Sequence, residues 1–219
     1  MTDQRKSGIA LIAGSLGGIL TMAIHPVAAG SMTVEQANHL AIVSGVAHSL
    51  ALVSVLALFL GAFGLARHLA SEDRFSFAAL VVFGFACVAI MIAASVSGFI
   101  VPNIIKSMLR DDRSNTHQWN IAIQSIFQIN QAMSKLYSVG TSLAIVLWSV
   151  AALRNGRLSR ALAIYGIAVS ALITIGIVVG HLRLDVHGMA IVAVTQALWF
   201  LVAAGQLCRI VPPSPRPTN

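Results

Sequence analysis

Charged residues are scarce in this chain. Asp, Glu, Lys and Arg make up 10% of its 219 residues, and 57% of the residues are hydrophobic. A soluble globular domain carries about 25% charged and about 45–50% apolar residues. The difference excludes an ordinary soluble enzyme and a disordered chain, since neither combines so little charge with so much apolar surface. The composition instead indicates a membrane protein with several spans.

Cysteine is scarce as well. Cys87 lies inside one apolar run and Cys208 at the end of another, without any CxxC spacing. Neither a disulfide framework nor a zinc knuckle is therefore indicated. The net charge of +7 does not point to nucleic acid, because the basic residues stand in short clusters between apolar runs, without interleaved aromatic residues. We expect the lipid bilayer, and no nucleic acid, as a partner.

Long apolar runs account for nearly the whole chain. A membrane helix needs about 20 mostly apolar residues at a rise of about 1.5 Å each. Six runs qualify, at roughly residues 8–30, 39–66, 75–101, 126–153, 162–182 and 187–208. The sequence predicts an all-α polytopic membrane protein, with six transmembrane helices in one bundle over residues 1–211. The proline-rich residues 212–219 cannot continue the last helix, and we expect them to form a disordered cytoplasmic tail.

The first apolar run allows two interpretations. Arg5 and Lys6 precede it and it ends in Val27-Ala28-Ala29, a pattern that also suits a signal peptide with its cleavage site. One helical face of the run, however, carries small and polar residues, namely Gly14, Gly18, Thr21 and His25. Small residues on one face allow close packing against another helix. We therefore expect a retained helix.

Lys and Arg are distributed unevenly between the two sides of a six-span layout. The side that holds both termini has nine: Arg5, Lys6, Arg67, Arg74, Arg154, Arg157, Arg160, Arg209 and Arg216. The other side has five: Lys106, Arg110, Arg113, Lys135 and Arg183. Cytoplasmic flanks carry the excess of Lys and Arg. We expect a multi-pass protein of the inner (plasma) membrane with both termini in the cytoplasm.

Most of the histidines fall on the outer half of this layout. His25, His39, His117, His181 and His187 lie near the outer boundary, and His48 lies about 13 Å deeper than His39 at helical rise. Histidine is a common metal ligand, and an ionisable side chain deep in a span indicates a functional site. We take three histidines as candidate ligands of haem or a transition metal: His25, His48 and His181. For the histidines at the boundary, a plain interfacial role is the simpler interpretation.

A polar stripe runs along the fourth span. At about 100° per residue, nine polar residues fall within a sector of about 80°: His117, Asn120, Gln124, Gln128, Gln131, Lys135, Ser138, Ser142 and Ser149. Such a stripe cannot face lipid, so it faces the bundle interior or, over 117–134, water. Together with polar residues of other spans it predicts an outward-facing pocket, lined by Thr21, Ser44, Gln131, Lys135, Ser138, Thr174 and Gln196.

The segment after the third span predicts a long outer hairpin. Pro102 is expected to kink the helix, and 111–116 is expected to form a turn with Asn115 or Thr116 as the N-cap of the next helix. Helices three and four would then project outward together. Residues 103–120 could dock a protein partner, and the small-residue faces would also allow oligomerisation.

Three functions remain open. The leading hypothesis is a membrane-embedded binding protein whose pocket, lined by histidine and amide side chains, holds a metal, haem or a small polar or amphipathic ligand. The first alternative is an accessory or assembly subunit without a ligand of its own. The second is a metal-dependent membrane enzyme, an oxidoreductase or hydrolase, although the chain has no HExxH, GxSxG or SxxK motif. The spans contain no acidic residue, which argues against a carboxylate proton relay.

Overall fold

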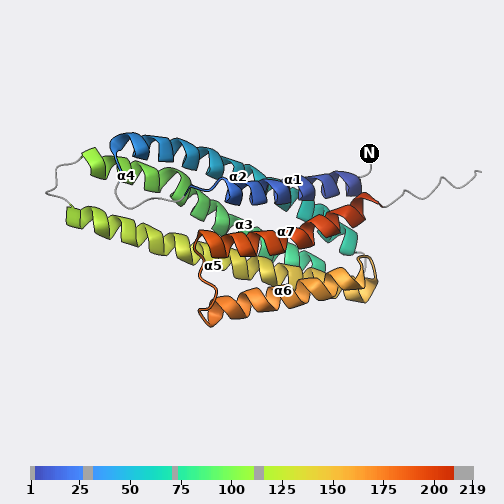
Figure 1. Ribbon diagram of the computed structural model, residues 1–219. Helices are drawn as coiled ribbons and strands as arrows, with labels where there is room; N and C mark the ends of the chain where they lie inside the picture. The colour runs from blue at the N-terminus through green and yellow to red at the C-terminus, as the bar shows by residue number, and fades with distance from the viewer. Residues whose placement is uncertain (1–2, 27–31, 71–73, 111–115, 210–219) are drawn as a thin grey trace, which may run out of the picture.

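All regular structure in the computed structural model is helical over the residues it describes, 3–26, 32–70, 74–110 and 116–209 (Figure 1). The helices are α1 (Asp3–Ala23), α2 (Val34–Leu69), α3 (Phe75–Ser95), the π-helical turn η1 (Val96–Ile100), α4 (Val101–Arg110), α5 (Thr116–Asn155), α6 (Arg160–Val178) and α7 (Val186–Cys208). Because η1 and α4 continue α3 without a break, these segments form six helices long and apolar enough to cross a membrane. The prediction of an all-α, multi-pass membrane protein is confirmed.

The helices differ from the predicted spans mainly at their ends. α1 ends at Ala23 instead of reaching residue 30, and α2 begins at Val34. The early start of α2 has a local cause, since the Thr33 side chain accepts a hydrogen bond from the Gln36 N–H and the Gln36 side chain accepts one from the Thr33 N–H. This capping box satisfies two donors that the first turn leaves free. Of the turn predicted over 111–116, residues 111–115 lie outside the described residues, as does the tail at 212–219, whereas Thr116 is the first residue of α5.

Glycines on α1 and α2 bring these two helices into direct contact. A Cβ at Gly14 would lie 2.6 Å from the Leu58 nitrogen, and a Cβ at Gly61 would lie 2.7 Å from the Leu11 nitrogen. Without side chains at these positions the backbones can meet. Gly14 thus behaves as the sequence indicated, whereas a Cβ at Gly18 would meet nothing within 4 Å. Gly17 faces α2 in its place, against Ser54.

Aromatic side chains join α3, α5 and α7 at the centre of the bundle. Trp148 stacks on Trp199 with ring centroids 6.0 Å apart and meets Phe83 edge-on at 5.6 Å. Phe200 packs against all three of these rings. The Trp148 indole also donates a hydrogen bond to the Ser76 carbonyl, at 3.2 Å. Large rings with a satisfied donor pack well in such a position, so this cluster joins the three helices within the core.

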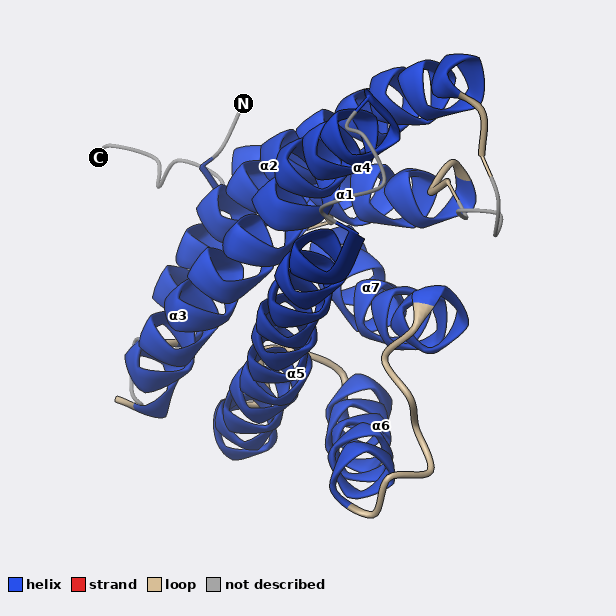
Figure 2. Ribbon diagram, turned by 90° about the vertical axis from the view of Figure 1, so that its left-hand side faces the viewer, coloured by secondary structure: helices blue, strands red, loops and turns tan. Residues whose placement is uncertain are grey.

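The six helices do not all have the same length or the same number of neighbours. Figure 1 shows the start of α2, α4 and the first half of α5 extending past the ends of α1, α6 and α7. Figure 2 shows α6 at the edge of the bundle, where it packs mainly on α5 and to a lesser extent on α7. The beginning of α1 and the end of α7 lie at the same end of the molecule (Figure 1), as an even number of spans requires.

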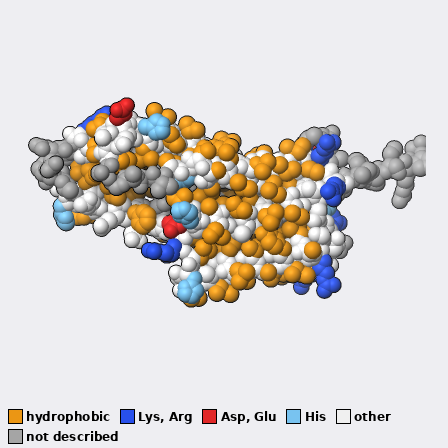
Figure 3. All heavy atoms as spheres, viewed as in Figure 1, with side chains coloured by type: hydrophobic (Ala, Val, Ile, Leu, Met, Phe, Trp, Pro, Cys, Tyr) orange, Lys and Arg blue, Asp and Glu red, His pale blue; other side chains and the backbone are white. Residues whose placement is uncertain are grey.

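Hydrophobic side chains cover the middle of the molecule, and Lys and Arg gather at the end that holds the start of α1 and the end of α7 (Figure 3). On the apolar surface, some large side chains are widely exposed, among them Phe85 at 74% and Leu172 at 70%. An apolar belt of this kind is what a bilayer covers. At the basic end, two side chains tie the loops together, because Asn155 donates to the Leu69 carbonyl and Arg157 to the His68 carbonyl.

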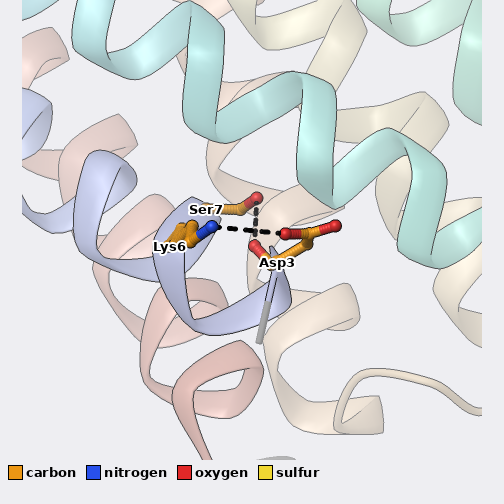
Figure 4. Close-up of polar contacts among 3 residues, drawn as sticks. All are labelled: Asp3, Lys6 and Ser7. Atoms are coloured by element: carbon orange, nitrogen blue, oxygen red, sulfur yellow. Dashed lines mark hydrogen bonds and ion pairs between the residues drawn. The ribbon is translucent and has the colours of Figure 1, made fainter. Parts of the chain in front are cut away.

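The first turn of α1 is held by short-range polar contacts (Figure 4). The Lys6 ammonium lies 3.7 Å from an Asp3 carboxylate oxygen, and the Ser7 hydroxyl donates to the Asp3 carbonyl at 2.9 Å. The ion pair is exposed, and such pairs contribute little to stability. Packing against α2 and α7, rather than charge, therefore holds α1 in place.

Candidate functional site

His25 and His48 lie side by side. Their ring centroids are 5.0 Å apart and the ring planes are inclined at 69°. His25 follows the end of α1 and is half-buried, whereas His48 lies within α2 and is only 4% exposed. The close packing of α1 on α2 thus brings together two of the three histidines that the sequence nominated.

The hydrogen bonds of the pair determine which ring nitrogen carries the proton. His25 Nδ1 lies 3.0 Å from the Pro26 carbonyl oxygen, and His48 Nδ1 lies 2.7 Å from the Ser44 carbonyl oxygen. A carbonyl oxygen only accepts, so Nδ1 is the donor in both rings. In the neutral imidazole Nε2 then keeps a free lone pair. Each ring is therefore anchored through Nδ1 and presents Nε2 as an acceptor.

The surroundings of His25 favour its neutral form. Burial lowers its pKa below the usual 6.5, and the hydrogen bond to the Pro26 carbonyl opposes this shift in part. Burial disfavours the charged form because the imidazolium loses hydration. The His25 ring is thus in the state that can offer a lone pair to a ligand.

Ser44 joins the pair to the neighbouring helix. Its hydroxyl donates to the Ser97 carbonyl at 3.1 Å and lies 3.3 Å from His48 Nδ1. Since the single hydroxyl proton is used toward Ser97, the hydroxyl can only accept from His48. Ser97 belongs to the π-helical turn η1, so this chain of bonds fixes His48 to both α2 and η1.

Gly98, on the π-helical turn, makes room for His48. A Cβ at Gly98 would collide with the His48 Cβ and lie 2.7 Å from its Cγ. The Val101 N–H donates to the Val96 carbonyl, five residues back. Pro102 follows, and it lacks an N–H and cannot donate to residue 98. Single π turns inside α-helices occur frequently at functional sites.

The structure adds a detail to the sequence prediction for this segment. The helix continues across Pro102 to Arg110, a π-helical turn lies just before the proline, and the kink expected at Pro102 stays a prediction. The widened turn removes the need for a donor at position 102. The outward projection of α4 and α5 as a hairpin remains a prediction.

A groove of about 530 Å³ begins beside the pair. It is lined by Pro26, Met32, Glu35, Gln36, His39, Leu40 and Val43. Pro26 is the residue whose carbonyl holds the His25 ring, so the groove adjoins the histidine at the end of α1. Glu35 and His39, one helical turn apart on α2, give the groove a polar side.

The third nominated histidine is elsewhere. His181 is exposed in the connection between α6 and α7. Within 3–26, 32–70, 74–110 and 116–209, no three His, Cys, Asp or Glu side chains come close enough to hold a metal ion together. The set of His25, His48 and His181 is therefore not assembled, and the predicted histidine cluster reduces to a pair.

The predicted pocket residues separate into two groups. Thr21, whose hydroxyl donates to the Gly17 carbonyl, and Ser44 belong to the α1 and α2 side. On the other side, Gln131 donates to the Leu184 carbonyl, and Gln196 donates to the Ser138 carbonyl and the Ser142 hydroxyl. In the part of the chain that the structure describes, no hydrogen bond connects the two groups. The second group acts as polar contacts between α5, α7 and the preceding loop.

Two other nominated residues lie nearer the surface. Lys135 is exposed on α5, and Thr174 is half-buried on α6. Along the α5 stripe, the residues from His117 to Gln128 are exposed, whereas Ser138, Ser142 and Ser149 are buried. The stripe is thus exposed in the first part of α5 and buried in the second part.

Sequence reasoning missed two parts of the site. It did not identify Gly98 or the Ser97 carbonyl as part of the site. A signal was present for Gly98, since Pro102 lies four residues later and cannot donate a hydrogen bond to its carbonyl. It also treated His39 as interfacial only, whereas His39 lines the groove. The pairing of His25 with His48 had no signal in the periodicity of either helix.

No family model, no curated protein and no solved structure matches this chain.

Proposed function

We propose that this chain is a membrane-embedded binding protein whose ligand site is the His25–His48 pair together with the groove beside it. The observation that carries the proposal is the anchoring of both rings through Nδ1 to backbone carbonyls. Fixing two imidazoles in this way costs conformational entropy and removes polar groups from water. A ligand that donates a hydrogen bond to both Nε2 atoms, or that both Nε2 atoms coordinate, would offset those costs.

Several features of the surroundings support a binding site over plain packing. The π-helical turn and Gly98 leave space for His48 that a regular helix with a side chain would fill. The groove is lined by Pro26, whose carbonyl accepts the hydrogen bond of the half-buried His25 ring. An ionisable side chain inside a span is expensive and marks a functional site by default.

The test uses the full chain purified in a mild detergent through a tag without histidine. Elemental analysis, an absorption spectrum and mass spectrometry of extracted small molecules are compared between the wild type, His48→Leu and the matched control His181→Leu. We expect a metal or an organic compound that co-purifies with the wild type and the control and is lost from His48→Leu. Equal content in all three proteins, or none in any, would contradict the proposal.

Orientation and membrane belong to the same proposal. The basic end of the bundle (Figure 3) would face the cytoplasm, which puts both termini inside and the groove outside. Thiol labelling of intact cells tests this with Arg157→Cys and His181→Cys, each in a chain without Cys87 and Cys208. Labelling of position 181 alone by an impermeant reagent is expected, and labelling of position 157 alone would reverse the orientation.

A second candidate function is an accessory subunit, favoured by the segment that extends past α1, α6 and α7 (Figure 1). On this part of α5, Ile121 and Phe127 are 52% and 56% exposed. Replacing both with serine would release a co-purifying membrane protein if a partner binds there, while the ligand content of the wild type would be retained.

A further inference from the structure

Both histidines have the arrangement that metal-binding histidines use. A ligating histidine almost always donates its second ring N–H to a carboxylate, a backbone carbonyl or water, which fixes the tautomer and the ring orientation. His25 and His48 each donate Nδ1–H to a backbone carbonyl. In both, Nε2 is the nitrogen left with a lone pair for a metal ion.

The spacing of the rings restricts the geometry. Metal–nitrogen bonds to histidine are roughly 2.0–2.1 Å long. Two imidazoles on opposite sides of one metal would then have centroids roughly 6 Å apart, and two at a tetrahedral angle roughly 5 Å apart. The observed spacing is 5.0 Å, which fits the tetrahedral arrangement. A haem held between the two rings would need the wider spacing, so haem does not fit this pair as it stands.

The ligand atoms restrict the class of metal. Calcium and magnesium prefer oxygen ligands, whereas neutral imidazole suits zinc, copper and other d-block ions. In the described parts of the chain, no third His, Cys, Asp or Glu completes a set. Two protein ligands leave coordination positions free, as in sites that exchange a ligand rather than closed structural sites.

We infer that His25 and His48 bind one d-block cation, zinc or copper, through their Nε2 atoms, with the remaining coordination positions filled by water or another small ligand. The inference rests on the proposed function above and names its ligand class. Ser44 is a positioning residue in this site, because it contacts His48 Nδ1 and the Ser97 carbonyl instead of the metal.

The experiment is a metal titration of the full chain in detergent, after removal of bound metal with a chelator. Zn²⁺ and, under reducing conditions, Cu⁺ are titrated separately in competition with a chromophoric chelator. We expect one ion per chain for at least one of the two metals. His25→Ala and His48→Ala should each weaken that binding at least tenfold, since changing a residue that only supports a metal ligand already costs about 10–100-fold.

The matched controls are His181→Ala and His187→Ala, two exposed histidines outside the pair. They should bind the metal as the wild type does. Equal losses in the controls and in the pair variants, or equal binding in all five proteins, would overturn the inference. The relative affinities of Zn²⁺ and Cu⁺ identify the metal.

A spectroscopic measurement keeps the inference testable where a variant fails to fold. In ¹⁵N-histidine NMR of the wild type, metal addition should shift two Nε2 resonances and leave two protonated Nδ1 resonances in place. A wild type that shows no shift with either metal overturns the inference. If an organic compound still co-purifies through His48, the proposed binding function stands and only its metal class fails. If nothing does, both fail.

Discussion

Gly98, on the π-helical turn, lies against His48 so closely that a Cβ at position 98 would overlap the Cβ of the histidine. A residue with a side chain at position 98 would therefore push His48 away. The position of His48 depends on this missing side chain as much as on its own hydrogen bonds to Ser44.

Gly98→Ala should therefore displace His48 and weaken metal binding at least tenfold, because a supporting contact of a ligand is changed. Titration with Zn²⁺ or Cu⁺ measures the loss, and circular dichroism should show unchanged helix content. Gly45→Ala is the control, since a Cβ at that position would meet nothing within 4 Å. Unchanged affinity in Gly98→Ala would mean that the turn does not position the histidine.

Two glycines on α1 should respond in opposite directions to the same substitution. Gly14→Ala places a Cβ 2.7 Å from the Ser54 carbonyl oxygen and should destabilise the protein by about 1–3 kcal/mol, as overpacking does. Gly18→Ala meets no neighbour and should stabilise it by about 0.5–1 kcal/mol, because alanine favours a helix. The free energy of unfolding in detergent measures both, and shifts of the same sign would contradict the packing described.

Gln196 is expected to stabilise the contact between α5 and α7. Gln196→Leu removes the hydrogen bonds to the Ser138 carbonyl and the Ser142 hydroxyl, at 3.2 and 3.1 Å. Interhelical bonds of this kind contribute about 0.6 kcal/mol on average and up to about 1.7 kcal/mol, so a loss of about 1 kcal/mol is expected. Gln128→Leu, at an exposed position of α5, should change the free energy of unfolding by less than about 0.5 kcal/mol.

Asp185 should make stability depend on pH at the start of α7. The Gly188 N–H donates to its carboxylate at 3.0 Å, and this bond is the main reason that the pKa of Asp185 lies below the usual 3.8. A carboxyl group with a lowered pKa adds stability above its unfolded pKa, and that stability is lost as the pH falls through the folded pKa. The Tm difference between the wild type and Asp185→Asn, measured from about pH 6 down to about pH 2, should shrink toward the acidic end. Parallel curves would contradict it.

The length of the apolar runs made the helices predictable, but the meeting of His25 with His48 was not. Periodicity shows which face of a helix a residue occupies, not which helix that face meets. The pair depends on the contact of Gly14 with Leu58, and the face of α1 could equally have met another span. The expected depth in the membrane marked each histidine as a candidate ligand, but only the packing of α1 on α2 shows that the two rings are neighbours.

The same limit explains His181 and the α5 stripe. His181 shares an expected depth with His25, but α6 lies at the edge of the bundle (Figure 2) and leaves the histidine exposed. On α5 the polar periodicity correctly marked Ser138, whose hydroxyl donates to the Ser134 carbonyl. It could not tell a hydrogen bond between helices from the lining of a pocket, since both need the same residue types.

The contact between α1 and α7 has a consequence for how the protein is made. A Cβ at Gly8 would meet Cys208, whose thiol lies 3.9 Å from the Arg5 carbonyl oxygen. Helix α1 therefore packs against a helix that leaves the ribosome much later than α1 itself. Until residues 186–208 are translated, α1 has α2 as its main neighbour and presents its second face to lipid. A chain that ends before residue 186 would keep α1 packed on one side only.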